Sequence, residues 1–187
     1  MNILIVGVGG QGTLLTSRVL GKYAELKGFD CKLSEVHGMA QRGGSVVTHV
    51  RFGEKVFSPI IWEGSADIIL SFEKLEALRA VNFLKKDGII LVNDEEIYPM
   101  PVITGKVKYP DGIKESLESV SKNLFFINAL ELAKKAGSSK AVNVVMIGAL
   151  TKKMNFDFDT MIKAIELSVP SKFVELNKIA LKLGYDA

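Results

Sequence analysis

The stretch MNILIVGVGGQG, residues 1–12, decides the fold. An apolar run at residues 3–6 breaks into four glycines, and a helical pattern follows at once. A strand that enters a helix through a glycine turn leaves main-chain N–H groups unpaired at the start of the helix, beside the positive end of its dipole. The segment therefore predicts a seat for a phosphate or another anion.

Three of these glycines, Gly7, Gly9 and Gly12, have the G-x-G-x-x-G spacing of nucleotide-binding turns. By itself the spacing indicates only an anion of nucleotide type, and a tight turn in which glycine serves close packing stays open as an alternative. The residues that we expect to form the seat are Gly7, Gly9, Gly10, Gln11, Gly12 and Thr13.

A dinucleotide site also requires an acidic residue about 20 residues further on, which binds the ribose hydroxyls. Glu35 is near that place, but a glycine-rich loop follows it, and pairing with Lys32 or with solvent explains it equally well. A stand-alone NAD-binding Rossmann oxidoreductase thus stays as the alternative function, although neither a ribose acid nor a hydride-transfer site is visible. A flavin-binding decarboxylase-like protein is a third possibility, which the colour of the purified protein would reveal.

Composition excludes several other classes. The 187 residues suit a single domain, residues 1–187, and the net charge of +3 is too small and too dispersed for a nucleic-acid surface. The single cysteine, Cys31, excludes a disulfide within the chain and an iron–sulfur cluster held by this chain alone. Because the first core strand begins at residue 2 and no apolar run is long enough to span a bilayer, we expect neither a signal peptide nor a membrane anchor, and a cytoplasmic protein.

Strand and helix patterns alternate along the chain. Apolar runs predict strands at residues 31–36, 46–52, 66–72, 88–93 and 124–127. Apolar spacing predicts helices at residues 14–27, 73–84, 129–135, 143–153, 159–167 and 171–183, with Asp157 or Asp159 as a cap and Gly184 ending the last helix. Residues 94–122 contain several prolines and glycines and predict an irregular surface excursion. The fold class is therefore α/β: a doubly wound, mostly parallel sheet with a Rossmann-like glycine turn, C-terminal helices and ligands at the carboxyl ends of its strands.

A second glycine-rich loop, HGMAQRGGS at residues 37–45, is too glycine-rich for a helix and too long for a hairpin turn, and it should leave the sheet at the same edge as the first turn. Arg42 would then offer a permanent positive charge, and Gln41 a donor, to an anion held there. Met39 and Arg42 could equally form a contact with another protein, and the two interpretations are compatible. From this loop we expect Arg42, Gly43 and Gly44 to join the site.

No catalytic or metal-binding residue is expected. His49 lies on an alternating strand, where a structural hydrogen bond is the expected role, and His37 could contact a partner or a ligand. Neither histidine has a positioned acid or nucleophile near it in sequence. We expect Trp62 to cover the sheet, and we expect Asn143 to cap a helix, with contact to the ligand as the alternative for Asn143.

Three segments together make the sequence resemble a known family: GVGGQG at 7–12, EVHGMAQRGGSVVTHVRFG at 35–53 and AVNVVMIGAL at 141–150. They are similar to the gamma-type subunit of the 2-oxoacid:ferredoxin oxidoreductases, and the loop at 37–45 looks most like the indolepyruvate branch, in which this is the small (beta) subunit. The resemblance covers essentially the whole chain.

The resemblance implies a non-catalytic subunit of an enzyme that converts a 2-oxoacid and coenzyme A to an acyl-CoA and CO2 and reduces ferredoxin. It places thiamine diphosphate and the iron–sulfur clusters in a large partner subunit, and it implies that the gamma-type chain helps to bind coenzyme A. Alone, the chain should be inactive, and it could form a dimer. We further expect residues 37–45 to dock against the large subunit.

Overall fold

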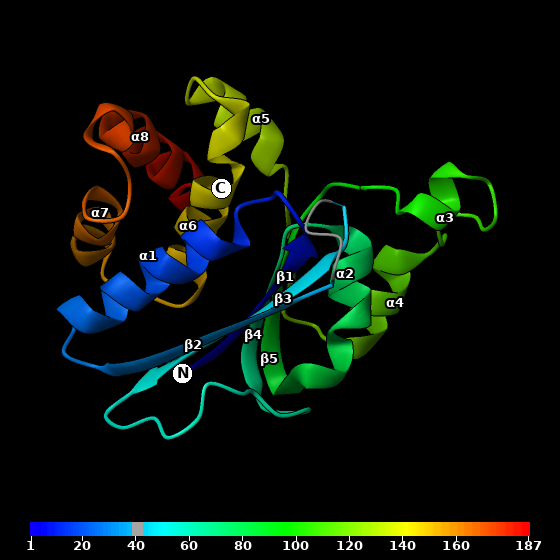
Figure 1. The fold of residues 1–187 in the computed structure, drawn as a ribbon, viewed down its shortest axis with the longest axis horizontal. Coiled ribbons are helices and arrows are strands. Elements are labelled where there is room, and N and C mark those ends of the chain that lie inside the picture. Colours follow the sequence, from blue (N-terminus) through cyan, green and yellow to red (C-terminus); the bar gives the residue numbers. More distant parts are fainter. Residues whose placement is uncertain (39–42) are drawn as a thin grey trace.

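The structure is a computed structural model that describes residues 1–38 and 43–187. Its centre is a six-stranded sheet in the order β2-β3-β1-β4-β5-β6 (Figure 1). The strands are β1 (Asn2–Val8), β2 (Asp30–His37), β3 (Ser45–Gly53), β4 (Ala66–Ser71), β5 (Leu84–Asn93) and β6 (Leu124–Ile127). From β1 to β6 each neighbouring pair is parallel, whereas β3 runs antiparallel to both β1 and β2. The predicted mostly parallel sheet is confirmed, with β3 inserted in the opposite direction.

β2 and β3 form a hairpin. Their pairing runs without a break from Asp30 opposite Gly53 to His37 opposite Val46. The expectation that the loop at 37–45 is too long to join a hairpin was therefore wrong. Pairing along the whole length of both strands fixes their register, so a short turn is not required.

Helices cover both faces of the sheet. One face packs against α1 (Thr13–Leu26), α5 (Ala129–Lys135), α6 (Val142–Lys153), α7 (Phe158–Glu166) and α8 (Val174–Tyr185). The other face packs against α2 (Lys74–Arg79) and α4 (Ile113–Val120). Alternate residues of β1 enter the two cores, with Ile3 and Ile5 on the first side and Leu4 and Val6 on the second, all of them fully buried or nearly so.

The helix predicted at 73–84 is shorter than expected. α2 ends at Arg79, and the chain tightens into a 3-10 turn, η1 (Val81–Phe83), before β5 begins at Leu84. The apolar pattern continued past the end of α2 because Val81 and Phe83 still pack against the same core. The apolar periodicity therefore predicted which residues are buried, but it did not distinguish an α-helix from a 3-10 turn.

The last predicted helix also differs. Residues 171–173 form a 3-10 turn, η3 (Ser171–Phe173), and α8 continues past Gly184 to Tyr185. The prediction that Gly184 ends the last helix was therefore wrong. Gly184 lies against Gly148 of α6, where a Cβ atom on either glycine would overlap the main chain of the other helix. The absence of side chains at these two positions lets α6 and α8 pack backbone to backbone.

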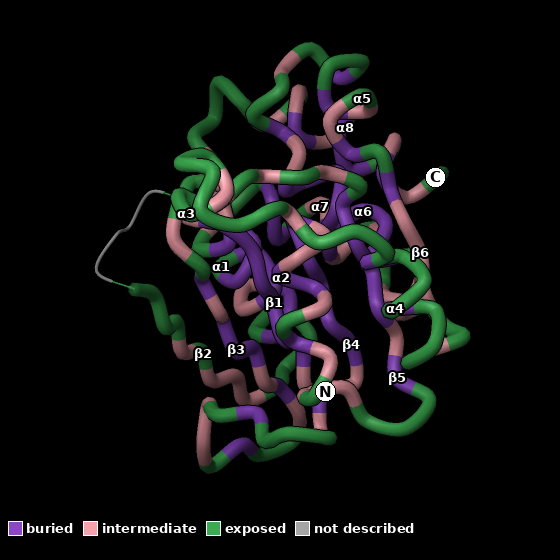
Figure 2. The backbone as a smooth tube through the Cα atoms, turned by 90° about the vertical axis from the view of Figure 1, so that its right-hand side faces the viewer, coloured by how far each residue is buried: buried purple, intermediate pink, exposed green. Residues whose placement is uncertain are grey.

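The predicted excursion at 94–122 contains two helices. α3 (Met100–Ile103) is a single short turn, and α4 buries Ile113 and Leu117 against the sheet. The stretch before α4 is exposed along most of its length, as Figure 2 shows around α3. No helix within the described part of the chain is both long enough and apolar enough to cross a membrane. The remaining 3-10 turn, η2 (Ser139–Ala141), precedes α6.

Candidate functional site

The turn between β1 and α1 is held in place by the side chain of Gln11. Its Oε1 accepts a hydrogen bond from the main-chain N–H of Val8 at 2.7 Å, and its Nε2 donates to the carbonyl of Phe72 at 2.9 Å. The amide therefore ties the turn to the end of the neighbouring strand β4. The main-chain N–H of Gln11 also donates to the carbonyl of Val8, at 3.1 Å, so Gln11 shapes the turn through both its side chain and its main chain.

The two glycine loops meet, as the sequence predicts. The N–H of Gly9 donates to the carbonyl of Gly44 at 2.8 Å, and the N–H of Gly43 donates to the carbonyl of Gly9 at 3.4 Å. These bonds continue the pairing of Val8 with Ser45 beyond the ends of β1 and β3. Arg42, like Met39 and Gln41, lies outside the described residues.

The glycines of the turn have different tasks. A Cβ atom on Gly7 would lie 2.9 Å from Oε1 of Gln11 and 3.1 Å from Cβ of Phe72. A Cβ atom on Gly12 would lie 2.7 Å from Nδ2 of Asn143. Close packing therefore accounts for both. Gly10 is different, because it has φ +105° and open space where a Cβ would stand.

A cavity of about 500 Å³ opens in front of this turn. It is lined by Gly10, Gln11, Gly12, Glu95, Ile97, Leu130, Ser139, Lys140, Val142 and Asn143. Gly12 begins α1 in a left-handed conformation, and among the described residues no side chain caps this end of the helix. The positive end of the α1 dipole thus faces the cavity, with Lys140 as a cation and Glu95 as an anion in its wall.

Asn93, at the end of β5, positions the cavity wall that contains Glu95. This role was not predicted from the sequence. Asn93 is buried, and its Nδ2 donates to the carbonyl of Phe72 at 3.2 Å and to Oε2 of Glu95 at 2.9 Å. Its Oδ1 accepts from the N–H of Ala129 at the start of α5, at 3.2 Å. The sequence signal that could have predicted this role is a polar asparagine at the end of a strongly apolar strand. Asn93 fixes Glu95 and α5 relative to the glycine turn.

Two polar residues have partners other than those expected. Glu35 does not pair with Lys32, which binds Asp30 instead; it is exposed to solvent, as one of the alternatives held, and it also accepts hydrogen bonds from Thr48 at 3.0 Å and from Thr13, the first residue of α1, at 3.4 Å. Asn143 does not cap α6, because Ala141 occupies that position and the Oδ1 of Asn143 accepts only from the adjacent N–H of Val144 at 3.0 Å. Asn143 is instead buried against Gly12 in the cavity wall.

His49 has the structural role that was predicted. It is buried, and its Nδ1 accepts a hydrogen bond from the N–H of Ile61 at 3.2 Å. Burial lowers the pKa of His49, so its imidazole stays neutral and can accept this bond. The expectation for Trp62 was wrong, since its neighbour Ile61 covers the sheet and Trp62 itself is exposed.

Ser45, at the end of the second loop, is held from α2. The hydroxyl of Ser45 donates to Oε2 of Glu76 at 2.5 Å, and Oε1 of Glu76 accepts from Arg79 at 2.6 Å. Glu76 is buried; the guanidinium of Arg79 balances its charge, and the hydroxyl of Ser45 satisfies its second oxygen. A second cavity, of about 290 Å³, lies on this side of the turn between Gly43–Gly44 and residues 99–101. No cluster of metal-ligating side chains is present among the described residues.

Comparison with known proteins identifies the family. The family model described as pyruvate ferredoxin/flavodoxin oxidoreductase matches residues 2–187. The indolepyruvate oxidoreductase subunit IorB of Archaeoglobus fulgidus is 44% identical over 190 residues, which covers 100% of this chain and 94% of that protein.

Solved structures share the fold. Pyruvate oxidoreductase subunit PORC of Thermotoga maritima superposes with a TM-score of 0.76 at 23% identity and covers 100% of this chain and 95% of its own. The 2-oxoglutarate:ferredoxin oxidoreductase of Magnetococcus marinus, solved with 2-oxoglutarate, coenzyme A and succinyl-CoA bound, superposes with a TM-score of 0.67 at 16% identity; the match covers 100% of this chain but 30% of that longer one. The resemblance found in the sequence motifs is confirmed, and the chain belongs to the pyruvate ferredoxin/flavodoxin oxidoreductase family.

Proposed function

We propose that this chain is the small, non-catalytic subunit of a 2-oxoacid:ferredoxin oxidoreductase, of the indolepyruvate type. The observation that carries the proposal is the 44% identity, over its full length, to a protein named as an indolepyruvate oxidoreductase subunit. The assembled enzyme would convert a 2-oxoacid and coenzyme A to an acyl-CoA and CO2 and pass the electrons to ferredoxin.

Within that enzyme, this chain would hold coenzyme A at the turn between β1 and α1. The open space at Gly10, the uncapped start of α1 and the side chain of Lys140 suit the phosphates of that ligand. The Magnetococcus structure was solved with coenzyme A bound, which supports the choice of ligand. We also include Thr13, Gly43 and Gly44 in the proposed site, because they lie beside the turn. Arg42 is included on the basis of the sequence alone.

The electron-transfer chemistry would belong to a larger partner subunit. A [4Fe–4S] cluster requires four thiolate ligands, and this chain contains one cysteine. The larger subunit would therefore carry thiamine diphosphate and the clusters, and its active site must reach the thiol of the coenzyme A held here. Residues 37–45 are proposed to touch that subunit, and the complex is proposed to work in the cytoplasm.

Titration calorimetry with coenzyme A tests the site. The wild-type chain should bind coenzyme A but not pantetheine, which lacks the phosphates. Lys140→Ala should weaken binding roughly tenfold, the effect of losing one charge-assisted contact, whereas Lys135→Ala, an exposed lysine of α5 outside the cavity, should not. Arg42→Ala should weaken it about 10- to 150-fold.

Two results would overturn this assignment: equal affinity for pantetheine, or tighter binding of NAD than of coenzyme A. Activity is a separate readout. The isolated chain should not reduce a viologen dye with any 2-oxoacid, and the assembled complex should.

A further inference from the structure

We propose that an apolar projection beside the glycine turn is the main docking surface for the larger, catalytic subunit. The projection comprises residues 98–107 and contains α3; it is called the α3 knob below. The inference rests on the proposed function, because it takes the partner to be the subunit whose active site must reach the coenzyme A held here.

The α3 knob exposes four large apolar side chains. Tyr98, Met100, Ile103 and Val107 are 51%, 65%, 64% and 56% exposed. Large exposed apolar side chains gathered in one short segment favour a site of protein–protein contact. Methionine and tyrosine are moreover enriched in the centres of such contacts.

The knob is a built structure and not a loose loop. At its base the buried carboxylate of Glu73 accepts hydrogen bonds from the hydroxyl of Tyr109 and from the N–H of Ile97, the latter at 3.3 Å. Burial and the nearby Glu73 carboxylate raise the pKa of Tyr109, so its hydroxyl keeps the proton that it donates. The rings of Tyr98 and Tyr109 pack 5.2 Å apart.

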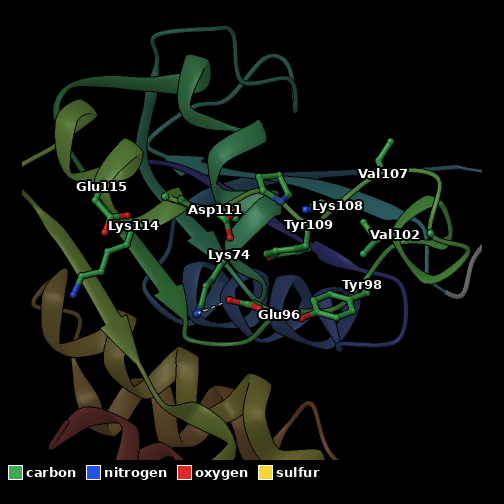
Figure 3. A pocket seen from close by; sticks show the side chains of 14 residues that line it. Lys74, Glu96, Tyr98, Val102, Val107, Lys108, Tyr109, Asp111, Lys114 and Glu115 are labelled. Atoms are coloured by element: carbon green, nitrogen blue, oxygen red, sulfur yellow. Dashed lines mark hydrogen bonds and ion pairs between the residues drawn. The ribbon is translucent and has the colours of Figure 1, made fainter.

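A second clamp holds the segment that leads into the knob. Lys74 of α2 pairs with Asp94 at 2.8 Å and with Glu96 at 3.2 Å, and Figure 3 shows the second of these pairs beside Tyr98. The tip is closed by main-chain bonds from Lys106 and Val107 to the carbonyl of Pro101, at 2.9 and 3.2 Å. A surface that is ordered before binding loses little conformational entropy when it docks.

The position of the knob selects the occupant. Pro99, Met100 and Pro101 line the 290 Å³ cavity together with Gly43 and Gly44, so the knob borders the same edge of the sheet as the glycine turn. A subunit that brings its active site to a ligand at this edge must lie against the knob. Lys106 and Lys108 are exposed at its rim, so the matching surface should be an apolar hollow edged by carboxylates.

A second exposed apolar pair provides a matched control. Phe57 and Trp62 are 85% and 73% exposed, but they lie in the connection from β3 to β4, at the opposite edge of the sheet from the turn. If any exposed apolar side chain served for docking, these two would serve as well as the knob. Variants at both places therefore distinguish docking at a specific surface from non-specific hydrophobic association.

The test measures the dissociation constant between this chain and the larger subunit from the same organism, by biolayer interferometry. The double variant Met100→Ala with Ile103→Ala should weaken association at least about tenfold, and Phe57→Ala with Trp62→Ala should leave it within about twofold. Unfolding temperatures verify that each variant is folded. Coenzyme A affinity of the isolated chain should not change in either variant.

Unchanged association of the knob variant would overturn the docking surface, as would an equal loss in the control variant. Analytical ultracentrifugation would show whether the isolated chain is a dimer that the knob variant converts to a monomer. That result would also overturn the proposal, because the knob would then bind a second copy of this chain. Failure of the wild-type chain to bind the larger subunit at all would instead contradict the proposed subunit function, so the two failures are distinguishable.

Discussion

Gly12 and Asn143 touch where the first helix begins: a Cβ atom on Gly12 would lie 2.7 Å from Nδ2 of Asn143. Gly12 has φ +86°, a left-handed conformation that glycine adopts without steric cost. This contact brings the start of α1 against α6, so the third glycine of the motif is required for packing. The ligand-facing space is at Gly10 instead.

Replacement of Gly12 by alanine should therefore destabilise the protein in two ways. The left-handed conformation costs about 1–2 kcal/mol for alanine, and the clash with Asn143 adds about 1–3 kcal/mol. Gly28→Ala is the matched control, because Gly28 has φ +77° but open space around a Cβ. In urea unfolding, Gly12→Ala should lose clearly more stability than Gly28→Ala; equal losses would contradict the packing role.

Glu95→Gln should tighten the binding of coenzyme A. The carboxylate of Glu95 lines the cavity in which the phosphates would lie, and its charge opposes theirs. Its removal should raise the affinity roughly two- to fivefold, which corresponds to about 0.4–1 kcal/mol. The neighbouring Glu96 pairs with Lys74 and does not line this cavity, so Glu96→Gln should have no effect in the same titration. A weaker affinity for Glu95→Gln would place the phosphates elsewhere.

Alanine at Gly148 or Gly184 should be among the most destabilising single changes in the chain. The new methyl group would overlap the main chain of the opposite helix, which cannot move aside as a flexible side chain can. We expect a loss of more than about 3 kcal/mol, at the upper end of overpacking effects. Gly21→Ala within α1 is the control, because its Cβ would make an ordinary contact at 3.4 Å with Leu33, and it should gain about 0.5–1 kcal/mol of helix stability. Denaturant unfolding of the three variants measures these differences, and similar values for Gly184→Ala and Gly21→Ala would refute the backbone contact.

Acid should destabilise the fold through His49. Its pKa in the folded state is lowered, so below about pH 6.5, the ordinary value, the unfolded chain binds a proton that the folded chain does not. The stability contributed by the neutral ring is present above that pH and is lost as the pH falls toward the folded-state pKa, by at most about 1.4 kcal/mol per pH unit. His49→Gln removes the titrating group, so its urea midpoint should fall less steeply between pH 7 and 5 than that of the wild-type chain. If the urea midpoints of the two proteins fell equally between pH 7 and 5, protonation of His49 would not be the cause of the acid destabilisation.

The parts of the fold that follow from nearby residues could be predicted from sequence. The apolar run before Gly7, the cap at Asp157 and the end of α5 at Lys135 all depend on neighbours within one or two turns. The meeting of the two glycine loops was also predictable, because strand ends at one edge of a sheet converge.

The remainder depends on residues distant in the chain. Gly184 has the local pattern of a helix end, and only the approach of Gly148, which is far away in sequence, shows its real role. Glu35 has Lys32 as an obvious neighbour, yet the fold brings Thr13 and Thr48 to it. Within the excursion, the i, i+4 pair Ile113 and Leu117 was a local signal for α4 that the prolines and glycines around it obscured.

The reversed direction of β3 has a thermodynamic consequence. Because β3 enters the sheet at the edge where β1 leaves it, Gly43 and Gly44 hydrogen-bond to Gly9 in the turn that is proposed to hold coenzyme A. A partner that changes the free energy of one loop must then change that of the other through these shared bonds, and such coupling is reciprocal. Ligand and partner would thus each raise or lower the affinity for the other by the same factor, so that the small subunit acts as the thermodynamic link between substrate occupancy and assembly.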